Sequence, residues 1–302
     1  MALRNVVWGG YEAWNTGTWR EGAVVVWMRR TAYPLLLLAT VVVAAVALHH
    51  GLDPGLATFG FQFGVIAYLL ILERVIPYDR AWHPDRREWG WYGVYFLLTA
   101  LGAITAQLLV AALVAVVSPA EPALPLAAEI PLALLVGSLA SYLVHRWCHT
   151  NPWLWRLHGV HHVPEKVNVA NNGVNHVLDV LLSQGGVQLS LSLLGFSRES
   201  VFVIGLFVVT QGYFTHANID VRIGRLNYVF AGPEQHRLHH STNLSEAGHF
   251  GSDLTVWDRV FRSYTWYPGR KPVAVGLHDP ASFPSTEAVF ASHLQAWRSP
   301  TT

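Results

Sequence analysis

The stretch ALLVGSLASYLVHRWCHTNPWLWRLHGVHH, residues 133–162, joins an apolar segment directly to two clusters of histidines. The first cluster, HRWCH, holds His145 and His149, and the second, HGVHH, holds His158, His161 and His162. Residues spaced i, i+3 and i+4 lie on one face of an α-helix. The stretch therefore predicts an apolar helix that ends in a group of neighbouring imidazoles.

A third cluster, HRLHH, repeats the spacing of the second with His236, His239 and His240. Gly232-Pro233 precedes it, and proline favours the first position of a helix. We likewise expect Asn151-Pro152 to end one helix and the second cluster to lie on a new one. Imidazole binds iron, copper, zinc and nickel well, so three clusters predict a site for several transition-metal ions.

The composition indicates a membrane protein. Of the 302 residues, 52% are hydrophobic and only 13% are charged, whereas soluble domains average about 25% charged residues. A helical span needs roughly 20 apolar residues. Four segments without Lys or Arg approach or exceed that length: 31–48, 56–72, 92–117 and 125–144. We expect an all-α membrane protein with about four transmembrane helices in two hairpins; the alternative, buried helices of a large soluble domain, is disfavoured.

The arginines and tryptophans predict the orientation. Residues 31–73 and 88–145 contain no Lys or Arg, and none of the thirteen tryptophans lies in 28–81 or 92–146. Basic residues favour the cytoplasmic side, and tryptophan favours the headgroup layer. We therefore expect a multi-pass protein whose metal site and both termini are cytoplasmic. The net charge of +1 and the lack of a basic run give no indication of nucleic-acid binding.

We divide the chain into three parts. Residues 1–30 are expected to form an interfacial segment, 31–264 a membrane-embedded domain with a cytoplasmic helical cap carrying the histidines, and 265–302 a C-terminal tail. The segments 177–195 and 200–214 are apolar but short or interrupted by polar residues, with Ser197 as an expected N-cap. They predict interfacial or partly inserted helices, and two full spans are the alternative.

The histidines are too numerous for one zinc ion, which takes three or four ligands, and they suit two metal ions. Carboxylate-bridged di-iron proteins need two Glu-x-x-His motifs, and only Glu246 with His249 matches. A histidine-rich di-iron centre is favoured, and copper is the alternative. The single cysteine, Cys148, is expected to be a packed residue. Five carboxylates are candidates for orienting the histidines: Glu165, Asp179, Asp220, Glu234 and Asp253.

The order His-x3-His, His-x2-His-His, His-x2-His-His after four apolar segments resembles the fatty acid hydroxylase and sterol desaturase superfamily of membrane di-iron oxygenases. The resemblance covers about residues 130–265. It extends to PWLWR at 152–156, FTHAN at 214–218 and WDRVF at 257–261. Two motifs depart from those of many relatives: residues 174–177 read VNHV, where Arg-x-His-Pro is common, and residues 249–251 read HFG, where Asn-Tyr-Gly is common.

The resemblance implies two iron ions, alternating between Fe2+ and Fe3+, that activate O2 and hydroxylate an unactivated C–H bond of a lipophilic substrate from the bilayer. It also implies a separate electron donor of the ferredoxin or cytochrome type with its reductase, and the chain shows neither GxGxxG nor HPGG. The implied metal ligands are His145, His149, His158, His161, His162, His236, His239 and His240, with His176 and His216 as additional ligands.

Other activities use similar residues. Desaturation and C–C or C–O cleavage are chemical neighbours of hydroxylation within the same superfamily. A zinc-dependent membrane hydrolase would need fewer ligands and a general base. A metal transporter would carry ionisable ligands in the middle of its spans, and the four apolar segments have no His, Asp or Glu there.

Overall fold

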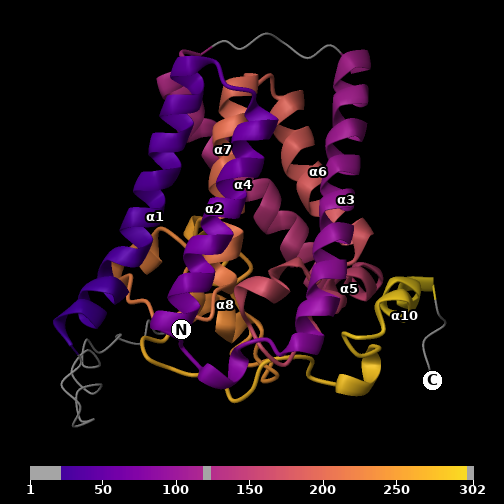
Figure 1. Cartoon of the computed structure of the whole chain (residues 1–302). Coiled ribbons are helices and arrows are strands. Elements are labelled where there is room, and N and C mark those ends of the chain that lie inside the picture. The colour runs from indigo at the N-terminus through magenta and orange to yellow at the C-terminus, as the bar shows by residue number, and fades with distance from the viewer. Residues whose placement is uncertain (1–21, 118–123, 298–302) are drawn as a thin grey trace, which may run out of the picture.

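The computed structural model describes residues 22–117 and 124–297, and within these ranges the chain is helical, with only isolated β-bridges. Four helices extend along the length of the molecule and are long and apolar enough to cross a membrane (Figure 1). They are α1 (Ala23–His50), α2 (Pro54–Val75), α3 (Arg86–Val117) and α4 (Leu126–Thr150). The four predicted spans are confirmed as helices. Most of the expected interfacial segment 1–30 lies outside the described residues, while 23–30 belong to α1.

Local sequence signals explain where these helices begin and end. α1 ends at Gly51, whose φ of 60° is in the left-handed region that glycine adopts without a steric penalty. Asp53 then caps α2 by accepting a hydrogen bond from the Leu56 N–H at 2.8 Å. Asn151 ends α4 and caps the next helix through the N–H groups of Trp153 and Leu154. The predicted break at Asn151-Pro152 is therefore confirmed.

Two further helices lie inside the bundle. α6 (Val177–Leu193) packs against α3 and α4, and α7 (Arg198–His216) packs against α1, α2 and α4 (Figure 1). Ser197 caps α7 as predicted, since its hydroxyl accepts a hydrogen bond from the Ser200 N–H at 3.2 Å. Both helices pack against the long helices, and neither is among the four that are long and apolar enough to cross a membrane. This packing agrees with the prediction of partly inserted helices.

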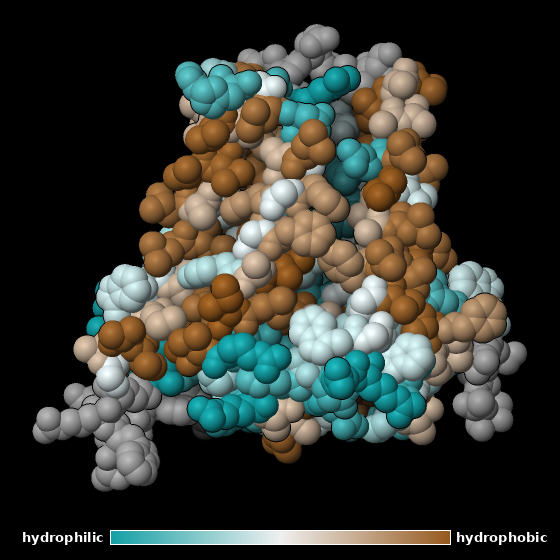
Figure 2. Space-filling model, in the orientation of Figure 1, coloured by the Kyte–Doolittle hydropathy of each residue, from teal (hydrophilic) through white to brown (hydrophobic). Residues whose placement is uncertain are grey.

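The remaining elements form a cap at the end of the bundle where α4 and α7 stop. The α-helices there are α5 (Pro152–His158), α8 (Pro233–His239), α9 (Val256–Val260) and α10 (Val289–Leu294). The 3₁₀ helices are η1 (Arg80–Trp82), η2 (Gly159–His162), η3 (Val169–Gly173), η4 (Gly224–Tyr228), η5 (Pro280–Ser282) and η6 (Gln295–Trp297). Figure 2 shows hydrophilic residues gathered at this end, below a largely apolar surface. The expected fold class, an all-α membrane protein with a helical cap, is confirmed.

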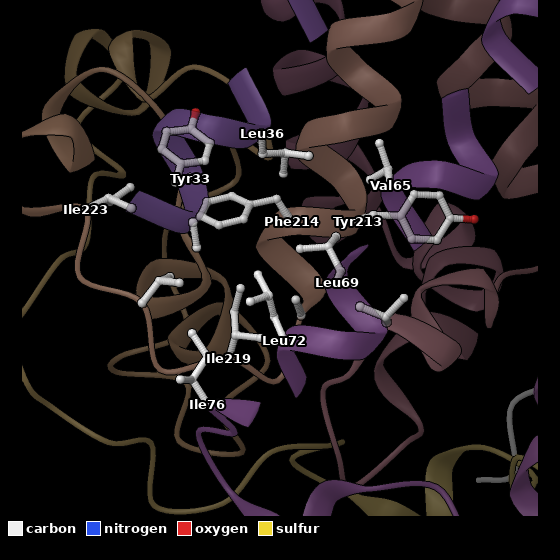
Figure 3. Close-up of a cluster of buried hydrophobic side chains, with 14 residues drawn as sticks. Tyr33, Leu36, Val65, Leu69, Leu72, Ile76, Tyr213, Phe214, Ile219 and Ile223 are labelled. Carbon is white, nitrogen blue, oxygen red and sulfur yellow. The ribbon is translucent and has the colours of Figure 1, made fainter. Parts of the chain in front are cut away.

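An apolar cluster fastens α7 to the first hairpin (Figure 3). Tyr33 of α1 stacks on Phe214 of α7 with ring centroids 4.2 Å apart, and Leu69 of α2 packs into the same fully buried cluster. Phe214 stands two residues before the end of α7 at His216. The cluster therefore holds the end of α7 at a defined position relative to α1 and α2.

Helices α3 and α6 approach closely at Gly102, where an added Cβ would stand 3.0 Å from the Val177 carbonyl oxygen and 3.1 Å from the Val180 Cβ. We predict that Gly102→Leu destabilises the fold by about 1–3 kcal/mol, because overpacking forces the two helices apart. Thermal unfolding of the protein in detergent measures the change. Gly60→Leu on α2 is the control, since nothing lies within 4 Å of its added Cβ. Equal unfolding midpoints for the two variants would contradict the described contact.

Candidate metal centre

Nine buried or half-buried histidines gather where α4, α5, η2, α7 and α8 meet, and they form two groups that could each hold a metal ion. Within each group, the candidate ligand nitrogens all lie within 4.8 Å of one another. The first histidine group is His145, His149, His158, His162 and His239, and the second is His161, His216, His236 and His240. All eight clustered histidines and His216 are thus brought together.

The spacing within each cluster decides which group a histidine joins. Every i, i+4 pair stays together: His145 with His149, and His158 with His162, in the first group, and His236 with His240 in the second. The histidine at i+3 belongs to the other group in both clusters: His161 lies in the second group, and His239 lies in the first. The two groups adjoin, because the ring of His162 stacks on that of His240 with centroids 4.3 Å apart. In each HH dipeptide, the two histidines therefore belong to different groups.

The local structure of the second cluster differs from the expected α-helix. Its first histidine, His158, is the last residue of α5, and His161 and His162 lie on the 3₁₀ helix η2. The expectation of one new α-helix carrying all three is therefore wrong. The third cluster lies on α8 as predicted, with Pro233 at its first position and His240 as its C-cap. Gly232 leaves room there for the Asn227 side chain, whose Oδ1 would stand 2.8 Å from an added Cβ.

The nitrogen separations fit metal binding. A histidine–metal bond is about 2.0–2.1 Å long in zinc sites, so two nitrogens at adjacent positions of one ion stand roughly 3 Å apart. In the first group, His145 Nε2 lies 3.1 Å from His158 Nε2 and 3.3 Å from His149 Nε2. In the second, His240 Nε2 lies 3.1 Å from His236 Nε2. The donor atoms already stand at the distances that a shared ion requires.

Four rings are oriented by hydrogen bonds on the side away from these nitrogens. A carbonyl or carboxylate oxygen can only accept, so each ring donates from Nδ1 and leaves Nε2 free to bind a metal. The acceptor is a backbone carbonyl for three of them and the Asp179 carboxylate for the fourth. The distances are 2.6 Å from His145 to Phe250 O, 3.2 Å from His161 to Val174 O, 2.9 Å from His216 to Asn168 O and 3.1 Å from His158 to Asp179 Oδ2.

Burial keeps the imidazoles neutral. Burial, followed by the neighbouring histidines, holds the pKa of five of them well below the usual value of 6.5: His161, His162, His236, His239 and His240. A neutral imidazole offers the lone pair that a metal needs. Moreover, His162 Nε2, His216 Nε2 and both ring nitrogens of His239 are buried without a hydrogen-bond partner. Such nitrogens are costly unless a metal or water satisfies them, so the residues fit a resident metal.

Two aromatic rings shield the histidines from solvent. Phe250 lies with its ring centroid 5.3 Å from that of His149, and Trp155 lies 5.4 Å from His162. Phe250 acts twice, since its carbonyl also orients His145. These roles, and those of the Asn168 and Val174 carbonyls, were not predicted. A backbone carbonyl leaves no signal in the sequence, whereas Phe250 was noticed only as part of an HFG motif that departs from the common Asn-Tyr-Gly.

The structure does not bring His176 to either group. Its Nδ1 accepts a hydrogen bond from the Leu178 N–H at 3.0 Å and caps α6, while its Nε2 lies 3.0 Å from the His293 carbonyl oxygen. Both nitrogens are therefore engaged, and the expected place of His176 beside the metals is not found. His249 is buried near Asp258, with 3.7 Å between Nδ1 and Oδ2, and also lies outside both groups.

Of the five candidate carboxylates, only Asp179 contacts a clustered histidine in the described structure. Asp220 pairs with Arg29, Glu234 accepts from Asn227 and Trp266, and Glu165 is exposed. Asp253 accepts a hydrogen bond from the Ser138 hydroxyl at 2.6 Å. Cys148 is buried 3.7 Å from Asp179 and belongs to neither group, which agrees with a packed residue.

Comparison with known proteins identifies the family. The family model for fatty acid hydroxylase matches residues 130–263, which include all nine histidines. The ornithine lipid hydroxylase OlsE of Rhizobium tropici is 31% identical over 225 residues, which cover 70% of this chain and 68% of that protein. Alkylglycerol monooxygenase of Danio rerio is 28% identical over 49% of this chain and 33% of its own length. Methylsterol monooxygenase 1 of Rattus norvegicus is 26% identical over 42% of this chain and 43% of its length. No solved structure matches.

The apolar helices, the histidine groups and these relatives together define an integral membrane oxidoreductase whose site is built to hold metal. The chain belongs to the fatty acid hydroxylase family, as its histidine motifs indicated.

The contrast between His216 and His176 gives a direct test of the two groups. We predict that His216→Asn lowers the metal content of the purified protein, because asparagine removes one of four candidate ligands of the second group. His176→Asn should leave the metal content unchanged, since asparagine preserves the N-cap of α6. Elemental analysis of the two proteins against wild type is the measurement. Metal loss in His176→Asn but not in His216→Asn would contradict the groups described.

The Asp179 carboxylate gives a second test. Asp179→Asn should weaken metal binding by about 10–100-fold, because His158 loses the anionic acceptor that orients its ring and raises its basicity. Titration of metal-stripped protein with Co(II), followed by absorbance, measures the affinity. Asp220→Asn is the control, since that carboxylate pairs with Arg29 and contacts no clustered histidine. An affinity equal to wild type in Asp179→Asn would refute this role.

Proposed function

We propose that the protein is a non-haem di-iron monooxygenase that hydroxylates an unactivated C–H bond of a membrane lipid. The observation that carries the proposal is the pair of adjoining groups, which hold five and four buried or half-buried imidazoles and are each compact enough to share one ion. Neither group includes a carboxylate of the described residues. A zinc hydrolase would need a general base at the metal, so this composition favours oxygen chemistry over hydrolysis.

The reaction must balance in atoms and electrons. One C–H bond and one O–O bond break, one C–OH bond forms, and the second oxygen atom leaves as water after taking up two electrons and two protons. Iron, when bound, supplies the O2 activation that side chains cannot provide. We propose that the two electrons come from a separate ferredoxin- or cytochrome-type donor with its reductase.

The residues of the chain hold, orient and shield the site. The Asp179 carboxylate and the three backbone carbonyls fix the ring planes, so the ligands need little rearrangement when metal binds. Phe250 and Trp155 pack against the rings and limit the access of water. Exclusion of water protects a strong oxidant from side reactions and favours attack on the bound substrate.

A membrane lipid is the substrate class that this position supports. The histidines lie at the end of the apolar bundle, where a lipid with its headgroup at the surface would meet them. The similar proteins carry names that specify ornithine lipid, alkylglycerol and methylsterol substrates, all of them lipids. We further propose that this end of the bundle and both termini face the cytoplasm, as the arginine and tryptophan distribution predicts.

The proposal is tested with purified protein, a lipid extract, 18O2 and a ferredoxin with its reductase. We expect two irons per chain by elemental analysis, and 18O in a lipid product only when both O2 and the electron carrier are present. His162→Ala should reduce this product to background, because it removes a buried ligand of the first group.

His278→Ala is the matched control, since His278 is exposed and belongs to neither group. Product formed without O2, or activity restored to metal-free protein by zinc and not by iron, would refute the proposed chemistry.

A further inference from the structure

An apolar groove lies between α2 and α3. Its cavity volume is about 200 Å³, which has room for part of a hydrocarbon chain and is smaller than the pockets of about 300–1,000 Å³ that enclose a whole ligand. One wall is the face of α2 from Phe63 to Leu70, and the other is the face of α3 from Trp89 to Phe96. The two helices make few direct contacts: α3 packs against α6, α2 packs against α7, and η3 contacts both α2 and α3. Both walls belong to helices that could cross a membrane, so the groove faces the bilayer.

The groove shares its inner wall with the histidine site. Val169 and Gly173, at the two ends of η3, line the groove. The residues that flank η3 orient ligands of the second group: the Asn168 carbonyl accepts from His216, and the Val174 carbonyl accepts from His161. Tyr213 of α7 also lines the groove, one helical turn before His216. The groove therefore adjoins the segment whose flanking carbonyls orient ligands of the second histidine group.

The two ends of the groove differ in polarity. At one end Trp89 follows Glu88, which forms an ion pair with Lys166 at 2.7 Å. At the other end Phe63 and Phe96 contact each other with ring centroids 6.3 Å apart. Tryptophan favours the headgroup layer, and an ion pair suits a charged headgroup more than a hydrocarbon chain. A lipid in the groove would thus have its headgroup at Trp89 and its chain toward Phe63.

We propose that this groove binds one acyl chain of the substrate lipid, so that the part of the lipid nearest the histidines is the headgroup and the first carbons of the chain. This inference rests on the proposed function and deepens it. From Trp89 to Phe96 the groove rises by about 10 Å, at 1.5 Å per residue, away from the end of the bundle that carries the histidines. A chain lying along it carries its far carbons away from the site, while its headgroup-proximal carbons remain beside η3.

Two glycines provide a matched pair of variants. Gly93 lines the groove on α3, and Gly64 lines a second apolar groove whose lining residues all belong to α1 and α2. Nothing lies within 4 Å of an added Cβ at either glycine, so the two backbones have equal room for the start of a larger side chain. Gly93→Leu should lower the rate of lipid hydroxylation by roughly tenfold or more, the size of effect that a misfit in an apolar pocket produces. Gly64→Leu should stay near wild type.

Two further readouts do not depend on these rates. A phosphatidylcholine with a diazirine on one acyl chain should label residues 89–96 and 169–173 saturably in wild type, and much less in Gly93→Leu. Fragmentation of the wild-type product by mass spectrometry should place the oxygen in the headgroup or the first carbons of the chain.

The outcomes separate this inference from the proposed function. No hydroxylated lipid from wild type would refute the proposed function, and the labelling would still test the groove. Active wild type with equal rates in Gly93→Leu and Gly64→Leu would refute the groove alone. So would unsaturable labelling, or oxygen at the far end of the chain.

Discussion

The structure depends on the packing of nine buried or half-buried imidazole rings at one end of an apolar bundle. A buried polar group without a partner costs about 1–3 kcal/mol, so a site with several unpartnered ring nitrogens is stable only when metal or water satisfies them. Hydrogen bonds to Asp179 and to three backbone carbonyls already satisfy the outer nitrogens of four rings. The inner nitrogens of His162, His216 and His239 have no such partner, so the metal binding that we propose would complete the core of the cap.

The long helices serve chiefly to position their own ends. The first cluster lies at the end of α4, and His216 lies at the end of α7. The Tyr33–Phe214 stack packs that end of α7 against the first hairpin. Between them, η3 touches both the groove and, through its flanking carbonyls, the second histidine group. The segment that contacts the proposed lipid chain is thus the one that orients metal ligands, which links substrate binding to the geometry of the site.

The sequence predicted what periodicity and composition encode: four apolar helices, the break at Asn151-Pro152 and the eight clustered histidines. It could not predict how the histidines divide between two groups, because that depends on the 3₁₀ geometry of η2 and on contacts between distant segments. The sequence did not distinguish His176 from His216. In the structure His176 caps the start of α6, whereas His216 ends α7 beside the other histidines, and this difference depends on where the two helix ends lie in space. The apolar groove between α2 and α3 could not be predicted either, because it is formed by the packing of α2, α3 and η3, and no local motif indicates that packing.

The two HH dipeptides affect how the proposed pair of iron ions would bind. His161 and His162 are consecutive residues with ligands in different groups, and so are His239 and His240. When one ion binds the first histidine of the dipeptide, it also restricts the backbone of the second histidine. The second ion then binds a ligand that has already lost part of its conformational freedom. Binding of the first ion therefore lowers the entropic cost of binding the second. Partly loaded protein should then be scarce, and the two ions should enter and leave as a cooperative pair.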